Sequence, residues 1–181
     1  NTAICSYTVT ISDNINPTIT CATNMTAYTS ASCTASVNTP NPVIADNCSV
    51  TKLTWILTGT TTASSPITGI NNLGNKVFNL GTTTVTYTVS DAANNSFSCS
   101  FTVTVIDNVL PVATLPDVTA QCSVTLTPPT ATDNCAGTVI GTTGDPITYN
   151  TQGTYTVSWS FDDGKGNVLV KEQTVIIDDT I

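Results

Sequence analysis

Acidic and amide side chains recur together along this chain, and their types are the ones that could do chemistry. Aspartate is followed directly by asparagine at Asp13, Asp46, Asp107 and Asp133. Carboxylate, amide and backbone oxygens together form a hard ligand set of the kind that Ca²⁺ prefers. The candidate ligands fall into two groups, which are Asp13, Asp46, Asp91 and Asn95, and then Asp107, Asp133, Asp163 and Asn167.

A second interpretation of the same residues needs no metal. Asp and Asn are common in turns because their side chains accept hydrogen bonds from nearby backbone amides. No stretch of the chain has the ligand spacing of a dedicated calcium loop such as the EF-hand. The sequence therefore leaves Ca²⁺ at the junctions between repeats and turn formation alone as alternatives.

Catalysis is not expected from these residues. The chain has no histidine, so a serine nucleophile would lack its usual general base. The cysteines are expected to be paired, and the carboxylates are expected at the ends of modules rather than across a cleft. We therefore predict that the protein is not an enzyme.

The candidate ligands can meet only if strands hold them at one end of a fold. Short runs alternate apolar with hydroxyl residues, turn residues separate the runs, and no helical periodicity is present. This pattern predicts an all-β fold of tandem antiparallel β-sandwiches. Where such a sandwich has the immunoglobulin-like arrangement, the entering linker, the loop after the second strand and the last hairpin loop gather at one end, so each group of candidate ligands should cluster.

One stretch of sequence occurs twice and sets the domain organisation. The run from Cys99 to Pro111 nearly repeats the run from Cys5 to Pro17, and a weaker third copy starts at Thr174. We interpret residues 1–13 as the last strand of a preceding, truncated repeat. The first repeat then covers 14–108, and a second, shorter repeat covers 109–181, as a segment cut from something longer.

Seven cysteines without histidine or a Cys-x-x-Cys pair indicate disulfides in an oxidising, extracellular place. Aligning the repeats places Leu115 at the position of Cys21 and Val170 at that of Cys99, so this pair is replaced together. The expected bonds are Cys21–Cys99, Cys33–Cys48 and Cys122–Cys135, with Cys5 unpaired because its repeat is truncated.

Charge excludes several classes of partner. Only 9% of the residues are charged, with four lysines, no arginine and a net charge of −8. No basic patch can form, so nucleic acid and direct membrane contact are not expected. Weaker motifs suggest modification, with an N-glycan acceptor pattern at Asn24 and an Asp-Thr-apolar O-glycosylation pattern at Thr180.

The combined motifs resemble one known family. The order is Asp-Asn-x-x-Pro, a cysteine four residues later, Asp-Asn-Cys, Gly-x-x-x-Val-x-Tyr, Asp-Ala-Ala-x-Asn and Cys-Ser-Phe-Thr-Val-Thr-Val. This order resembles the hyalin-repeat (HYR) family over nearly all of residues 1–108 and more weakly over 109–181. The resemblance implies an immunoglobulin-like module of extracellular adhesion proteins. The Thr- and Asn-rich sequence is similar to repeat arrays in Bacteroidota surface proteins, including gliding-motility adhesins.

Two function classes and one variant follow from these observations. The first is a structural repeat of a secreted or cell-surface fibre or adhesin, with neighbouring repeats of the same chain as partners. The rival is a module that binds surface glycans or proteins, for which Tyr28 and Tyr149 are the aromatic candidates. The variant is a filament-forming subunit, in which a linker strand is shared between chains.

Overall fold

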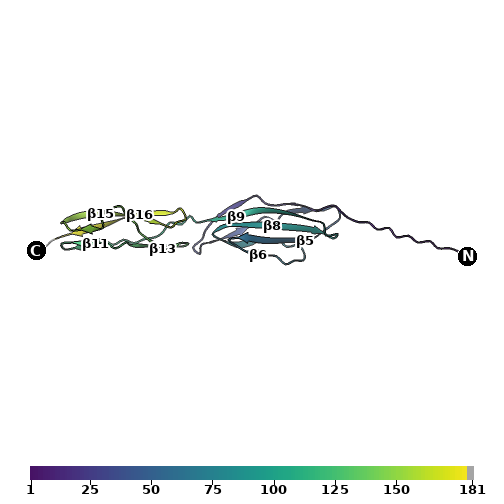
Figure 1. Cartoon of the computed structure of the whole chain (residues 1–181), viewed down its shortest axis with the longest axis horizontal. Coiled ribbons are helices and arrows are strands. Elements are labelled where there is room, and N and C mark those ends of the chain that lie inside the picture. The colour runs from purple at the N-terminus through teal and green to yellow at the C-terminus, as the bar shows by residue number, and fades with distance from the viewer. Residues whose placement is uncertain (179–181) are drawn as a thin grey trace. The chain divides into compact units, whose positions relative to one another are not determined.

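The computed structural model describes residues 1–178 and consists there of β-strands joined by turns and loops (Figure 1). The chain divides into two compact units. The first unit contains Asn1–Ala27 and Ser36–Thr104, and the second contains Tyr28–Ala35 and Val105–Ile181. The predicted all-β class is therefore confirmed, and no helix long and apolar enough to cross a membrane occurs in the described part.

The strands of the first part of the chain form a five-stranded sheet in the order β2-β9-β8-β5-β6 and two smaller sheets, β3-β7 and β1-β4. Alternation of apolar and hydroxyl residues makes one face of each long strand apolar, as β8 shows with every second residue buried. The strand bounds are β1 Thr18–Thr20, β2 Met25–Tyr28, β3 Thr34–Asn38, β4 Val43–Ala45, β5 Val50–Gly59, β6 Ala63–Ser64, β7 Asn75–Asn79, β8 Gly81–Asp91 and β9 Ser96–Ile106.

The core of the first unit is built from these apolar faces. Phe78, Val85, Tyr87 and Val103 are completely buried, and Leu53 of β5 is also buried. Trp55 of β5 is only partly buried. Its ring lies beside Lys76, whose Nζ is 5.8 Å from the ring centroid.

The second unit has a three-stranded sheet in the order β10-β16-β15 and two-stranded pairs β11-β14 and β12-β13. The pairing of β10 with β16 is parallel, which the prediction of purely antiparallel sheets did not include. The strand bounds are β10 Val118–Ala120, β11 Val124–Thr125, β12 Thr130–Asp133, β13 Gly137–Ile140, β14 Thr148–Tyr149, β15 Gly153–Asp162 and β16 Val168–Ile177.

The long hairpin of the second unit repeats the core positions of the first. Val157, Trp159 and Phe161 of β15 are buried, as are Val85, Tyr87 and Val89 of β8 at the aligned positions. Strand β15 pairs with β16 from Gly153↔Ile177 to Asp162↔Val168 without a shift of register. The turn that follows β15 carries Asp163, so the hairpin fixes where this candidate ligand lies.

The compact units do not coincide with the sequence repeats. The segment Tyr28–Ala35 lies inside the first repeat, yet it belongs to the second unit. Thr29 N donates to Ile106 O at 3.0 Å, and both residues belong to that second unit. Residues 1–12 form no strand, and Ile4, Tyr7, Val9 and Ile11 are exposed, so their assignment to a preceding repeat stays a prediction.

The disulfides differ in part from the expected pairing. Cys21 is bonded to Cys99, with Cα atoms 5.8 Å apart, and this pair ties the start of the first unit to β9. The expected Cys33–Cys48 and Cys122–Cys135 bonds were wrong, because Cys33 is bonded to Cys135 with Cα atoms 4.9 Å apart. The prediction assumed that each loop closes within its own repeat, whereas Tyr28–Ala35 folds with the second unit. Cys5, Cys48 and Cys122 are free and exposed.

Candidate metal centre

Three carboxylates of the second unit meet at the ends of its strands, and we call them the second acid cluster. Asp107 directly follows β9, Asp133 ends β12, and Asp163 directly follows the long strand β15. One oxygen of each lies within 4.8 Å of one oxygen of the other two. Their exposed fractions are 4%, 5% and 7% respectively, so the cluster is buried.

Local turns hold each carboxylate in place. Asp133 Oδ1 accepts hydrogen bonds from the backbone amides of Cys135 at 2.8 Å and Ala136 at 2.6 Å. Asp163 Oδ1 accepts from Lys165 N at 2.7 Å, and its Oδ2 accepts from Asn167 Nδ2 at 2.6 Å. These contacts are turn chemistry that needs no calcium. They satisfy one oxygen of Asp133 and both oxygens of Asp163.

Asp107 is held by the chain on both sides of it. Its Oδ1 accepts from Val109 N at 3.2 Å and from Thr29 Oγ1 at 3.0 Å. Its backbone oxygen accepts from Asn167 Nδ2 at 3.3 Å. The entering linker is thereby tied to the last hairpin loop and to the 28–35 segment within one unit.

Turn chemistry leaves several buried oxygens of this cluster without a hydrogen bond. They are Asp107 Oδ2, Asp133 Oδ2 and Asn134 Oδ1. A buried polar atom without a partner costs about 1–3 kcal/mol, and more when the group is charged. Within the described residues, the hydrogen-bond donors to the three carboxylates are backbone amides, a hydroxyl and an amide side chain, all uncharged.

Mutual repulsion adds to that cost. Two unit charges roughly 5 Å apart repel by about 3 kcal/mol at an effective dielectric constant of about 20. Burial by itself raises the pKa of Asp163, but hydrogen bonds from Asn167 and from the amides of Lys165 and Gly166 outweigh it, so the pKa lies below its ordinary value. Asp163 is therefore ionised at neutral pH. A divalent cation would neutralise the cluster and give the unpaired oxygens a partner.

The first unit contains the same arrangement, the first acid cluster, formed by Asp13, Asp46 and Asp91. One oxygen of each lies within 4.8 Å of the others. Asp46 Oδ2 accepts from the amides of Cys48 at 3.0 Å and Ser49 at 2.9 Å, while Asp46 Oδ1 is buried without a partner. Asp91 accepts from Asn95 Nδ2 at 2.7 Å, in the same way as Asp163 accepts from Asn167.

The two clusters differ in how well they are covered. Asp13 and Asp46 are only partly buried, whereas Asp107 and Asp133 at the matching places are buried. Asn134 Nδ2 donates to Ser30 O at 2.9 Å, but its counterpart Asn47 donates to Asp13 Oδ1 at 3.3 Å. The 28–35 segment thus covers the second cluster. In the described part of the first unit, Asn47 has no such segment to which it donates a hydrogen bond. The hydrogen bond from Ile15 N, followed by that from Asn47, lowers the pKa of Asp13.

The structure therefore brings all six predicted aspartates together in two triads. Asn95 and Asn167, also predicted as ligands, donate through Nδ2 to the linker carbonyl oxygens of Asp13 and Asp107 and to carboxylates. The amide nitrogens of Asn95 and Asn167 therefore hold the carboxylates of Asp91 and Asp163 in position. Sequence reasoning missed Thr29 and Ser30, because nothing in their local pattern indicates that this segment folds with the second unit.

The other predicted sites have separate outcomes. Asn24 is exposed and its Oδ1 accepts from Thr102 N at 2.9 Å, so glycosylation there stays a prediction. Thr180 lies outside the described residues. Tyr28 is 60% exposed, but Tyr149, the other aromatic candidate for a glycan, is only 8% exposed.

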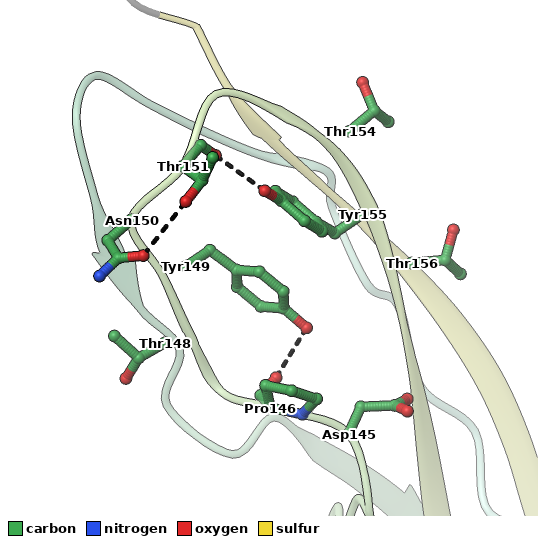
Figure 2. Close-up of a pocket in the computed structure, with 9 residues that line it drawn as sticks. All are labelled: Asp145, Pro146, Thr148, Tyr149, Asn150, Thr151, Thr154, Tyr155 and Thr156. Carbon is green, nitrogen blue, oxygen red and sulfur yellow. Dashed lines mark hydrogen bonds between the residues drawn. The ribbon is translucent and has the colours of Figure 1, made fainter.

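A pocket of about 560 Å³ lies around Tyr149 and Tyr155 (Figure 2). The two rings lie against each other, with centroids 4.6 Å apart and an interplanar angle of 35°. Tyr149 Oη donates to Pro146 O at 2.7 Å, and Tyr155 Oη donates to Thr151 O at 2.9 Å. Both hydroxyls are engaged internally, and the rings contact each other, so the pocket does not offer Tyr149 as a free stacking surface.

Comparison with known proteins identifies the family. The family model described as the HYR domain matches residues 12–105. The chain belongs to the HYR domain family. A curated relative, hyalin of Lytechinus variegatus, is 33% identical over 130 residues, which is 65% of this HYR chain and 24% of hyalin. The HYR chain therefore spans about a quarter of that relative, and the expected Bacteroidota surface-protein origin receives no support.

Solved structures similar to this HYR chain are distant. A Drosophila N-cadherin EC1-4 structure has a TM-score of 0.40 at 14% identity, covering 91% of this chain and 50% of that one. A Bacteroides ovatus glucan utilization locus protein, SGBP-B, has a TM-score of 0.34 at 12% identity, covering 90% and 48%. Similarity at this level carries no information on function.

Proposed function

We propose that this HYR chain is a structural segment of an extracellular adhesion-type protein, stiffened by one Ca²⁺ at each acid cluster. Family membership and the two disulfides support an extracellular module. The observation that supports a bound metal ion is the second acid cluster. Its three buried carboxylates accept hydrogen bonds only from uncharged donors, and two of their oxygens have no partner. Neighbouring repeats are the proposed partners.

Calcium would act on the linker in particular. Asp107 belongs to the chain that enters the second unit, while Asp133 ends β12 and Asp163 directly follows β15 of that unit. An ion bound to all three would fix the entering linker to these strand ends through charge-assisted contacts. Asp13, Asp46 and Asp91 would do the same at the first unit. The gain would be stiffness and resistance to unfolding rather than chemistry.

The test is a calorimetric titration of calcium-free protein with Ca²⁺, together with the melting temperature in calcium and in chelator. We expect two bound ions and a rise in melting temperature with calcium. Asp133→Asn should abolish binding at the second cluster and Asp46→Asn at the first. The Asn oxygen in either variant can still accept the turn hydrogen bonds, so these variants remove charge while keeping turn chemistry.

A matched control removes the same charge elsewhere. Asp117 is exposed and lies outside both clusters, so Asp117→Asn should leave both ions bound. In chelator, Asp133→Asn should melt at the same or a higher temperature than the parent, because it relieves like-charge repulsion. Absence of binding heat, together with identical melting in calcium and chelator, would leave turn formation as the whole explanation of the clusters.

Recognition of glycans is the second function class, and it now depends on Tyr28. Tyr149 is buried with its hydroxyl engaged, which removes one of the two aromatic candidates. A glycan array with the full chain would show micromolar binding to a defined sugar if this function applies. Loss of that binding in Tyr28→Ala would assign it to the exposed ring.

A further inference from the structure

The long strand β15 lies at the edge of its sheet, and another strand covers only part of that edge. Ser160 and Thr142 exchange both of their backbone hydrogen bonds there, each of 2.8 Å, in an antiparallel bridge. The next residue that faces this edge is Ser158, whose amide donates to Asp145 Oδ2 at 2.7 Å. At Ser158, a side-chain carboxylate therefore takes the place of a neighbouring strand.

Two further residues of β15 direct their backbone toward the same edge. The direction of hydrogen bonding alternates along an antiparallel strand, so Thr156 and Thr154 face the same way as Ser160. The register with β16 continues through this stretch without a shift, which keeps the alternation. Among the described residues, the amide and carbonyl of Thr154 and Thr156 find no partner at this edge, and both residues are exposed. A strand edge of this kind can pair with another extended chain.

The edge is open because the neighbouring segment changes sheets. After Thr142 the chain leaves β15, and β14, Thr148–Tyr149, pairs with β11 of another sheet. The pocket of about 560 Å³ is lined by both segments, with Asp145, Tyr155 and Thr156 among its residues (Figure 2). The unpaired backbone of β15 therefore lies directly beside a space that can receive a side chain.

The tyrosine pair forms one wall of that space. Tyr155 alternates with Thr154 and Thr156, so its ring lies on the opposite face of the strand. There it packs against Tyr149, with ring centroids 4.6 Å apart. A peptide residue paired opposite Tyr155 would direct its side chain to the same face, against this ring.

The charge in the pocket favours a cationic side chain. Asp145 is exposed, and it is the one charged residue among those that line the pocket. Burial first, and then the negative charge of Asp145, raise the pKa of Tyr149, so this charge acts inside the pocket. A carboxylate beside an aromatic ring suits Lys or Arg, whose stem contacts the ring while the head pairs with the carboxylate.

We propose that the open edge of β15 binds an extended peptide of another protein, antiparallel to the strand, with Lys or Arg opposite Tyr155. Main-chain hydrogen bonds to Thr154 and Thr156 would give the pairing, and the basic side chain would give the specificity. The net charge of −8, without arginine, favours a basic partner over an acidic one and over a second copy of this chain. The site uses no residue of either acid cluster, so it does not depend on bound calcium.

The test is an NMR titration of the isotope-labelled full chain with the peptide acetyl-Thr-Val-Arg-Val-Thr-amide. In the proposed register, the two valines pair with Thr154 and Thr156, and the arginine lies opposite Tyr155. The amides of Thr154 and Thr156 should show saturable shifts, because they gain acceptors. The amides of Ser158 and Ser160 should move less, because they are already hydrogen-bonded within the chain.

Methylated peptides separate strand pairing from charge attraction alone. In this register the N–H of each valine faces β15, whereas the N–H of the arginine faces away. Methylation of a valine amide should weaken binding by about fivefold or more, because it removes a main-chain hydrogen bond. Methylation of the arginine amide is the matched control and should change binding little. A peptide with glutamate in place of arginine should not bind.

Protein variants test the two halves of the site. Asp145→Asn can still accept the hydrogen bond from Ser158, and it should weaken binding of the arginine peptide by about two- to fivefold, as expected for an exposed ion pair. Asp117→Asn removes the same charge outside the pocket and should have no effect. Thr156→Pro removes an N–H that faces the open edge, where proline is tolerated, and should abolish the peptide shifts while the spectrum stays dispersed.

Several outcomes would overturn the proposal. One is that the Thr154 and Thr156 amides do not move at millimolar peptide, and another is that the two methylated peptides bind equally well. Equal binding of the arginine and glutamate peptides would contradict the role of Asp145. Shifts of the same amides on concentrating the protein alone would instead assign the edge to a second copy. Shifts with cellohexaose but not with peptide would assign the pocket to a glycan.

Discussion

At the scale of single residues, each unit has a buried aromatic side chain whose polar atom is used inside the core. Tyr87 Oη accepts a hydrogen bond from Leu73 N at 3.0 Å, and Trp159 Nε1 donates to Gln173 Oε1 at 2.9 Å. These aromatics stand at aligned positions of β8 and β15. Their partners could not be predicted, because Leu73 lies in a stretch whose sequence indicates only an irregular loop.

Tyr87→Phe should therefore destabilise the first unit. The change leaves the buried amide of Leu73 without an acceptor, which costs about 1–3 kcal/mol. Urea unfolding at neutral pH measures this loss, and Tyr28→Phe at an exposed ring serves as the control that should change little. Equal stability of Tyr87→Phe and the parent would show that the Leu73 amide finds another acceptor.

The same side chain gives an alkaline pH dependence. Burial, opposed by the hydrogen bond from Leu73, raises the pKa of Tyr87 above its ordinary value of 10.0. The unfolded chain then ionises first, so this contribution to stability is complete below about pH 10 and is lost as pH rises toward the folded-state pKa. Tyr87→Phe should remove this part of the alkaline decline, which denaturant titrations between about pH 9 and pH 11 would reveal.

At the scale of strands and loops, the positions of the acid clusters could be predicted but the pairing of the loops could not. Asp13, Asp46 and Asp91 meet because linker, loop and hairpin turn lie at the same end of a sandwich, and local sequence patterns are enough to place those turns. The pairing of Cys33 with Cys135 depends on a contact far apart in sequence. Two repeats read side by side give equivalent positions, but they do not say whether equivalent cysteines pair within a repeat.

The bond that links the start of the first unit to β9 has a large expected effect. Cys21 and Cys99 are separated by 78 residues, and the chain-entropy model gives about 4 kcal/mol for closing such a loop. Cys21→Val with Cys99→Val should lower the free energy of unfolding by about that amount, because the unfolded chain gains freedom. Chemical denaturation measures the loss.

Cys5→Val is the control for this double variant, since Cys5 is free and exposed. It should leave the denaturation midpoint unchanged. Leu115 packs against the core of the second unit, while Val170 is 62% exposed, so the residues that replace this disulfide do not form a buried apolar pair there. If the double variant of the first unit is as stable as the parent, native-state strain in the bond cancels the entropic gain.

At the scale of the whole molecule, the chain enters the second unit, leaves it and enters it again. The 28–35 segment contributes Thr29, Ser30 and Cys33 to that unit, and residues from Val105 onward contribute the remainder. Hydrogen bonds of Thr29 to Asp107 and to Ile106 and of Asn134 to Ser30 hold the segment there, together with the Cys33–Cys135 disulfide. Stability of the second unit therefore depends on residues from within the first repeat.

Cys33→Ser with Cys135→Ser should weaken the second unit selectively. Calorimetric unfolding is expected to show a lower melting temperature for one transition. Calcium should also bind more weakly at the second acid cluster, because the 28–35 segment that covers it is no longer held by the disulfide. Cys48→Ser with Cys122→Ser removes the same number of sulfurs and should leave both transitions of the monomer unchanged. A uniform shift of all transitions would indicate that the two units unfold together.

The shared 28–35 segment also limits how this protein can be divided. A gene fragment encoding 14–108 would carry Cys33 but leave its bonding partner behind, and one encoding 109–178 would begin after Asp107 and lack Thr29. Excising a single HYR repeat along the sequence period therefore cuts through a folded body. Exchange or loss of repeats by recombination would preserve folding only where each new neighbour supplies a compatible segment, so adjacent repeats in this lineage should be inherited as matched pairs.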